Sequence, residues 1–396
     1  MSLPRGIKGE AKNIFEVLSN KKYKLDFYQR EYKWGTPNVI DLLEDLTSKF
    51  FSCYDKTHER IDVKEYGNYF LGPVVICKKK NGNFIIDGQQ RLTTLTLLIM
   101  YLDNLQKDRE DKISLDQLIS SESFGKKSFN LEVGEREECM GALYKNELFD
   151  ITDQSESVQN LYSRYQDIKE NFPDGLDDTN MLHFIDWLLN KVEIVEITAY
   201  NDEDAYTIFE TMNDRGISLS PTDMLKGYLL AHMGTTRRGP ANELWRNQVG
   251  ELIKIDKDQE IDFFKVWLRA KYAETIRERK KGAVNKDFEN INSFHRWVRN
   301  EKKRLGLDKK SDFQDFVMNK FKFFSNQHIQ ILKASSLFEK DLEYVYYNAS
   351  NTFTLQYPLL LAPLLPDDNP DTIKKKIRLV AGYIDIFIAR RVWNQR

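Results

Sequence analysis

Apolar residues recur at two different spacings in the first half of the chain, and each spacing predicts a different kind of element. Spacings of three and four residues predict amphipathic helices, which fall at 11–18, 36–50, 92–102 and 203–212. Short runs rich in apolar or β-branched residues predict strands, which fall at 23–28, 69–77, 84–86 and 192–197. Helices and strands that alternate in this way predict a mixed α/β domain.

Turn and capping residues mark several boundaries. Asn81-Gly82, between the second and third of these strands, predicts a β-hairpin. Thr36-Pro37 offers an N-cap and a first-turn proline to the helix that follows. Ser220-Pro221 offers the same pair to a later helix, with Asp223 placed to complete a capping box.

The rest of the chain shows helical periodicity alone. Residues 103–190 are polar, and we expect them to form a helical insertion. No strand is predicted beyond about residue 231. The predicted fold class is therefore α+β: an α/β domain over 1–230 with the insertion at about 103–190, followed by an all-helical domain over 231–396.

The composition excludes several classes of protein. The 59 Lys and Arg against 61 Asp and Glu give a net charge of −2, which excludes a wholly basic nucleic-acid coat protein. Cys53, Cys77 and Cys139 form no CxxC pair, which argues against a disulfide scaffold and favours a reducing cytoplasm. Neither a secretory signal nor a run of ~20 apolar residues is found, so we expect no membrane partner. The abrupt end at 390–396 indicates part of a longer protein.

The sharpest candidate site is the predicted strand–turn–helix at 84–99. The free N–H groups and the positive dipole end of a helix N-terminus favour an anion. Arg91 can bind a phosphate through two N–H groups, and Asp87 can hold a magnesium ion that bridges phosphates, or orient a water. The other residues of this turn are Gly88, Gln89, Gln90, Thr93 and Thr94. An equally compatible interpretation is that Asp87 and Gln90 only cap the helix while Arg91 pairs on the surface.

Two further segments can complete such a site. Residues 27–34 interleave aromatic side chains with Gln, Arg and Lys, which can stack on a base and hold a phosphate. Residues 210–220 contain Asn213 and Gly216 as helix-end residues, with Arg215 between them. For each segment taken alone, a simpler interpretation is favoured: an edge strand packed on the core, and a capped connection between two helices.

Three blocks stand in a fixed order over about residues 10–230. They read FYQREYKW, YFLGPVVICKKKNGNFIIDGQQRLTTLTLLI and FETMNDRGISLSPTDMLKGYL. Together they resemble the N-terminal domain of GmrSD-type restriction proteins, and the DGQQR block is highly specific. The resemblance implies the ParB/sulfiredoxin-like α/β fold. It also implies nucleotide binding and hydrolysis coupled to defence against foreign, often modified, DNA.

Carried over residue by residue, the resemblance implies a site for a nucleoside triphosphate (NTP) and Mg²⁺. It makes Asp87, Gln90 and Arg91 the candidate catalytic residues, with Asp87 also the metal ligand. The residues expected in this way to bind the nucleotide are Tyr28, Gln29, Arg30, Gly88, Gln89 and, by looser analogy with nucleotide-binding ParB proteins, Asn213 and Arg215. Thr93 and Thr94 are expected to bind it as well, because their hydroxyl groups can donate to a phosphate.

Many members of that family continue into an HNH nuclease domain, whose metal-activating histidine needs further His or Asn ligands nearby. Here the histidines are scattered singly, at His58, His183, His232, His295 and His328. We therefore expect no nuclease site in this chain, and a nuclease domain or subunit outside it.

One segment of the helical part is strongly basic. Between Arg269 and Lys310 there are 14 Lys and Arg against six acids, with aromatic residues interspersed. Such a surface can contact the backbone of DNA, although a solvated helix face is the simpler interpretation. The candidate DNA-binding residues are Arg277, Arg279, Lys280, Lys281, Arg296, Arg299, Lys302, Lys303 and Arg304.

The sequence thus predicts a nucleotide-binding, NTP-hydrolysing sensor domain of a DNA restriction system. The alternative is a ParB-like switch that binds nucleotide or DNA without turnover. A protein-interaction subunit without a ligand is disfavoured, because the polar residues at 87–94 have no packing duty that would require all of them. The base of the nucleotide and the oligomeric state are left open.

Overall fold

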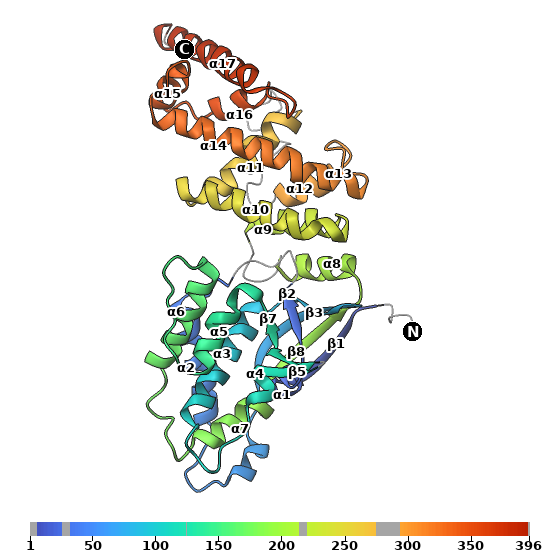
Figure 1. Ribbon diagram of the computed structural model, residues 1–396, viewed down its shortest axis with the longest axis vertical. Coiled ribbons are helices and arrows are strands. Elements are labelled where there is room, and N and C mark those ends of the chain that lie inside the picture. The colour runs from blue at the N-terminus through green and yellow to red at the C-terminus, as the bar shows by residue number, and fades with distance from the viewer. Residues whose placement is uncertain (1–5, 26–31, 124, 214–219, 275–293, 395–396) are drawn as a thin grey trace. The chain divides into compact units, whose positions relative to one another are not determined.

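The computed structural model describes residues 6–25, 32–123, 125–213, 220–274 and 294–394 (Figure 1). Contacts within the chain divide it into two compact units, Met1–Gly216 and Ile217–Arg396. The domain ranges expected from the sequence, 1–230 and 231–396, differ from these units in assigning helix α9 (Pro221–Ala231) to the first part. As domain limits, those ranges stay a prediction.

A six-stranded mixed sheet organises the first unit, in the order β1-β8-β3-β4-β2-β7 (Figure 1). Its strands are β1 (Lys8–Asn13), β2 (Tyr23–Leu25), β3 (Tyr69–Lys79), β4 (Gly82–Asp87), β7 (Leu131–Glu132) and β8 (Val192–Ala199). β1 is antiparallel to β8, and β3 is antiparallel to β4. The β3/β8, β2/β4 and β2/β7 pairs are parallel. The predicted hairpin and the predicted strand at 192–197 are confirmed.

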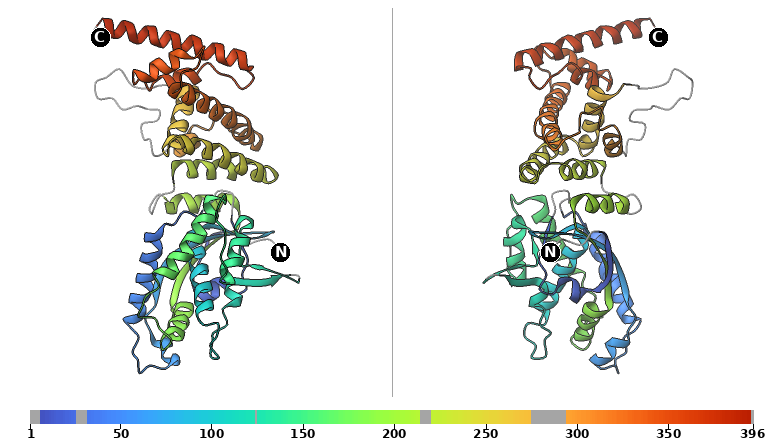
Figure 2. Two further views of the ribbon diagram at one scale, coloured as in Figure 1. Left: turned by 60° about the vertical axis from the view of Figure 1, so that its left-hand side comes forward. Right: turned by 90° about the vertical axis from the view of Figure 1, so that its right-hand side faces the viewer.

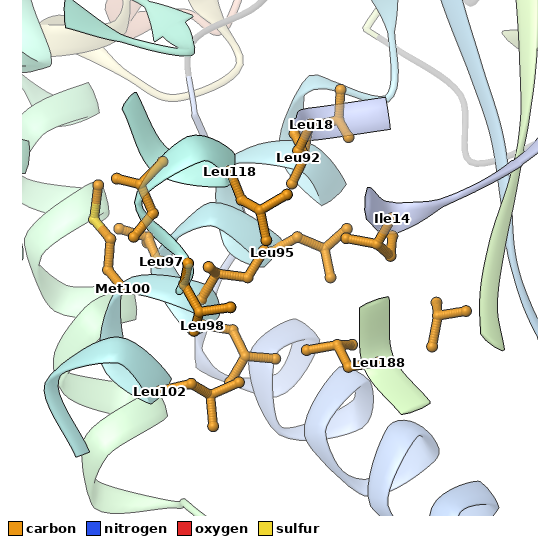
Figure 3. Close-up of a cluster of buried hydrophobic side chains, with 14 of the residues drawn as sticks. Ile14, Leu18, Leu92, Leu95, Leu97, Leu98, Met100, Leu102, Leu118 and Leu188 are labelled. Carbon is orange, nitrogen blue, oxygen red and sulfur yellow. The ribbon is translucent and has the colours of Figure 1, made fainter. Parts of the chain in front are cut away.

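One face of the sheet is covered by helices, which form the main hydrophobic core around α3. They are α1 (Ile14–Leu18), α2 (Thr36–Phe51), α3 (Gln89–Leu105), α4 (Asp116–Ile119), α5 (Glu137–Tyr144), α6 (Glu156–Glu170) and α7 (Met181–Lys191). Leu92, Leu95, Leu98 and Leu102 of α3 have no exposed surface, and α1, α4 and α7 pack their leucines and isoleucines against them (Figure 3). Burying each such side chain stabilises the fold by about 1.5–3 kcal/mol. The predicted helix at 92–102 is confirmed.

The opposite face of the sheet is covered by α8 (Asp202–Asn213), which contacts β3, β4 and β8. Because side chains alternate along a strand, Cys77 and Phe84 point away from the main core and are buried on this second face. An ion pair between Lys79 and Asp202 (2.6 Å) ties the end of β3 to the start of α8. The predicted helix at 203–212 is confirmed.

Two expectations for the first unit are corrected. Residues 11–18 are not one helix: Lys8–Asn13 is a strand paired with β8, and the helix is only Ile14–Leu18. The segment 103–190 is not purely helical: it contains the hairpin β5 (Ser120–Ser123) and β6 (Lys126–Phe129), and β7 joins the main sheet. For β1 and β7, pairing with strands far away in the sequence supplies the backbone hydrogen bonds, so local helical spacing does not decide. For β5 and β6 a local hairpin supplies them.

The second unit is helical throughout residues 220–274 and 294–394, as expected for the region beyond about 231. Its helices are α9, α10 (Thr235–Ile255), α11 (Gln259–Tyr272), α12 (Phe294–Asn300), α13 (Lys310–Asp315), the π-helical turn η4 (Phe316–Phe321), α14 (Lys322–Ser336), α15 (Glu343–Ser350), α16 (Gln356–Leu361) and α17 (Pro370–Trp393). α17 packs against α15 and α16 (Figure 2). Ser220 is confirmed as the N-cap of α9, because its hydroxyl accepts the Asp223 N–H (3.1 Å). The Asp223 carboxylate accepts from the Ser220 hydroxyl (3.0 Å) and not from its backbone N–H as in a capping box.

Stacked aromatic rings form the core of this second unit. Trp245 stacks on Phe264 and Phe321, with ring centroids 5.2 and 4.6 Å apart, and Phe263 stacks on Trp267. These side chains are at most 3% exposed. No helix within the described ranges is long and apolar enough to cross a membrane.

A buried histidine in this core makes the stability of the fold depend on pH. His328 is 1% exposed and lies beside Phe263 and Tyr357, and neither ring nitrogen has a hydrogen-bond partner among the described residues. Burial lowers its pKa from 6.5 to about 4. The unfolded chain therefore binds this proton more readily, and stability falls as the pH drops from about 6.5 to 4.

We expect the free energy of unfolding to fall by about 2 kcal/mol more between pH 7.5 and pH 5 in the wild type than in His328→Leu, because leucine carries no proton. Urea unfolding at the two pH values measures this difference. Equal losses in the two proteins would contradict the buried, neutral histidine.

Candidate functional site

The candidate site begins at a tight turn between β4 and α3. β4 ends at Asp87, and α3 begins at Gln89 with Gly88 as its N-cap. Gly88 has φ +90°, in the left-handed region that favours glycine. A Cβ atom at Gly88 would lie 2.7 Å from Cγ2 of Val74 on the neighbouring strand β3. The turn therefore depends on glycine both for its backbone angle and for its close approach to β3.

Two features of the α3 N-terminus suit an anion that is bound together with a cation. Its cap residue, Gly88, has no side-chain oxygen to accept the first-turn N–H groups. The preceding Asp87 is half-buried, and within the described residues its carboxylate makes no hydrogen bond or ion pair. A lone carboxylate beside a positive helix end suits a cation that is shared with a bound anion.

A metal ion at this turn would need ligands beyond the protein. No group of three or more His, Cys, Asp or Glu side chains in the described part of the chain is placed to hold one. Magnesium keeps several waters and typically takes one or two carboxylates together with substrate phosphates. Asp87 fits such a half-site, in which phosphate oxygens and waters complete the coordination.

The Arg91 side chain extends from α3 to strand β3. Its Nη1 donates to the carbonyl of Pro73 (2.7 Å), and its guanidinium lies against Gly72, where a Cβ atom would be 3.3 Å from Cζ. Gly72 lies at a register shift in β3. Arg91 thus fastens α3 to the irregular part of β3, which was not predicted, and this contact uses one of its five N–H donors.

The remaining polar residues of the turn are packed inside. Gln89, Thr93 and Thr94 are 1–3% exposed. The Thr94 hydroxyl bonds the hydroxyl of Tyr32 (2.8 Å) and donates to the carbonyl of Gln90 (2.9 Å). These residues therefore have packing and hydrogen-bonding roles within the unit, and their expected contact with a nucleotide stays a prediction.

Gln90 joins the first and second sequence blocks. Its Oε1 accepts the backbone N–H groups of Lys33 (2.9 Å) and Trp34 (3.0 Å). Tyr32, in the same block, is fully buried, and burial raises its pKa to about 12. Tyr28, Gln29 and Arg30 lie outside the described residues. The structure thus brings residues 32–34 to the DGQQR turn, an adjacency that no local signal predicts.

The third block is described only at its ends. α8 ends at Asn213, whose side chain lies outside the described set, as does Arg215. α9 follows from the Ser220 cap. The expected roles of Asn213 and Arg215 stay predictions.

The basic segment is described in part. Arg277, Arg279, Lys280 and Lys281 lie outside the described residues. Arg296, Lys302 and Lys303 are exposed, whereas Arg299 is half-buried. These exposed cations can meet a phosphate backbone.

Some residues of the basic segment have structural roles in the second unit. Arg304 pairs with Glu301 (3.3 Å) and Glu274 (3.8 Å), and its guanidinium lies 5.7 Å from the Trp297 ring centroid. Phe294 is 2% exposed and stacks on Phe264, so it belongs to the core and offers no surface to a base.

Comparison with known proteins places these features in a family. A model of the GmrSD restriction endonuclease N-terminal domain matches residues 14–230, more than half of the chain. Over 245 residues the chain is 26% identical to the uncharacterized protein MJ0686 of Methanocaldococcus jannaschii, a region that covers 54% of this chain and 41% of that protein. The matched region contains the β4–α3 turn with its DGQQR residues. The chain therefore belongs to the GmrSD restriction endonuclease family and is part of a restriction-system protein, with the family's N-terminal domain at residues 14–230.

Proposed function

We propose that the β4–α3 turn binds a nucleoside triphosphate and hydrolyses it with magnesium, as the sensor step of DNA restriction. The supporting observation is the pairing of two features at one turn. The helix N-terminus has no side-chain cap, and the adjacent Asp87 carboxylate has no partner among the described residues. The helix end favours the phosphates, and the carboxylate favours the metal that neutralises them.

Asp87, Gly88 and Arg91 each have a distinct part in this proposal. Gly88 lets the α3 N–H groups approach the phosphates without an intervening side chain. Asp87 holds Mg²⁺ or orients the attacking water. Arg91 approaches the phosphates with the guanidinium donors that its contact with Pro73 does not use. Water attacks the terminal phosphorus, and the bond to the bridging oxygen breaks, so that a nucleoside diphosphate and inorganic phosphate leave.

Phosphate release from ATP, GTP, CTP and UTP with Mg²⁺ tests this proposal. We expect turnover with at least one of the four, and none when EDTA removes the metal. Isothermal titration of the same nucleotides reports binding separately. The proposal would be overturned if neither binding nor turnover were found, also when the chain is assayed together with the nuclease domain or subunit expected outside it.

A second function, nucleotide binding without turnover, is favoured by one observation. Two of the longer polar side chains of the turn already contact the protein backbone, Gln90 through Lys33 and Trp34, and Arg91 through Pro73. A turn anchored in this way can serve as a switch that holds a nucleotide. Saturable binding with no phosphate release would support this function over hydrolysis.

We further propose that the exposed part of the basic segment contacts DNA. Lys302 and Lys303 are exposed and can each neutralise a phosphate. We expect Lys302→Glu/Lys303→Glu to weaken DNA binding by at least tenfold in 0.1 M salt and to flatten the dependence of affinity on salt. Lys257→Glu/Lys340→Glu, at two exposed lysines outside the segment, is the matched control. Equal affinities for the two double variants would contradict a DNA contact at Lys302 and Lys303.

A further inference from the structure

Two helices hold the short segment 32–34 from opposite sides of its backbone. On the α3 side, Gln90 accepts the N–H groups of Lys33 and Trp34. Thr94, one turn further along the helix, bonds the hydroxyl of Tyr32. The N–H side of the segment and its one buried ring are therefore fastened to the DGQQR helix.

The α6 side holds the carbonyl groups. Asn160 Nδ2 donates to the carbonyl of Tyr32 (2.9 Å). Arg164 Nη1 donates to the carbonyl of Trp34 (3.0 Å), and its Nη2 donates to the hydroxyl of Thr36 (3.2 Å). Asn160 and Arg164 are four residues apart, so they lie on one face of α6, as the two α3 residues do on theirs.

Two largely buried arginine side chains next to the segment 32–34 are held by further partners: Arg164 of α6, and Arg136, which precedes α5. The Arg164 side chain is only 12% exposed, and its Nε pairs with Asp167 one turn away. Arg136, which is 2% exposed, lies 5.8 Å from the ring centroid of Tyr32 and donates to the Ser157 hydroxyl (2.8 Å). A planar guanidinium fixed by several partners loses little further freedom when it holds a carbonyl.

We infer that Asn160 and Arg164 are positioning residues of the DGQQR site, which set the place of Gln90 through the backbone of residues 32–34. The peptide unit between Tyr32 and Lys33 has its carbonyl group on α6 and its N–H group on α3. Trp34 likewise gives its N–H group to α3 and its carbonyl group to α6. Loss of the α6 contacts would release the N–H groups from Gln90 as well. The inference rests on the proposed nucleotide site for its functional consequence, and it gives segment 103–190 a role that its sequence does not suggest.

Hydrogen exchange of the nucleotide-free protein tests the positioning directly. In Arg164→Ala we expect the amides of Lys33 and Trp34 to exchange at least tenfold faster than in the wild type. Arg164→Lys keeps a donor within reach and should recover part of the protection. The matched control is Tyr165→Phe, also in α6, which removes the part-buried hydrogen bond that Asn104 of α3 donates to the Tyr165 hydroxyl (3.1 Å) and does not touch residues 32–34.

Nucleotide affinity, measured by titration on the same four proteins, tests the functional consequence. We expect Arg164→Ala to bind at least tenfold more weakly and Tyr165→Phe to bind as the wild type does. Combined with Gln90→Ala, the Arg164→Ala change should cost little more, because both act through one segment.

The possible failures are distinguishable. Unchanged exchange in Arg164→Ala overturns the positioning role, whatever the nucleotide does. Faster exchange with unchanged nucleotide affinity overturns the link to the site. If Arg164→Ala exchanges faster but the wild type binds no nucleotide, the positioning role stands and the proposed function is overturned.

Discussion

Asp87→Asn is expected to abolish magnesium-dependent NTP hydrolysis, with a loss of at least a hundredfold, or about 2.7 kcal/mol of transition-state stabilisation. Asparagine keeps the shape of the side chain but removes the charge that a magnesium ion requires. Because Asp87 makes no hydrogen bond or ion pair among the described residues, the substitution should lower the free energy of unfolding by only about 0.3–1 kcal/mol, the contribution of a negative charge beside a helix N-terminus. Phosphate release under saturating nucleotide measures the effect.

The other end of α3 offers a matched control. Like Asp87, Asp103 has a half-buried carboxylate; it lies near the C-terminal end of α3, and burial raises its pKa. We expect Asp103→Asn to hydrolyse nucleotide at the wild-type rate. Nucleotide binding by Asp87→Asn without magnesium should be retained or tighter, because a negative charge beside the phosphates is gone. Full turnover in Asp87→Asn would contradict its role as metal ligand.

Gly88→Ala is expected to destabilise the first unit by about 2–5 kcal/mol. Part of this loss, about 1–2 kcal/mol, is the cost of a Cβ atom in the left-handed backbone region. The rest, about 1–3 kcal/mol, comes from overpacking, because the new Cβ would lie 2.7 Å from Cγ2 and 3.2 Å from Cα of Val74. Urea unfolding followed by circular dichroism measures the change.

A control variant and a double variant test these causes. Gly141→Ala in α5 meets no atom within 4 Å, and alanine in a helix interior should stabilise the unit by about 0.5–1 kcal/mol. Gly88→Ala combined with Val74→Ala should cost less than the sum of the two single changes, because the second removes the methyl group that the first strikes. A loss below 1 kcal/mol in Gly88→Ala alone would contradict the close packing of this turn.

The α/β character, the β3–β4 hairpin, helix α3 and the helical second unit are all predictable from the sequence. Each has a strong local signal, either apolar spacing over several turns or a turn dipeptide between two apolar runs. The DGQQR turn is predictable for the same reason, since its glycine and its flanking polar residues are adjacent in the chain.

Only the tertiary structure decided which partners these elements take. Residues 8–13 become β1 because β8, more than 180 positions later, offers a free edge. The direction of the Arg91 side chain depends on the carbonyl of Pro73, next to the register shift in β3. Gln90 and Arg164 meet at Trp34 from two different helices. Such contacts depend on the packing of distant segments, which no local spacing encodes. The sequence by itself therefore determined the DGQQR turn and the strand and helix that flank it, and packing decided which distant residues hold the turn in place.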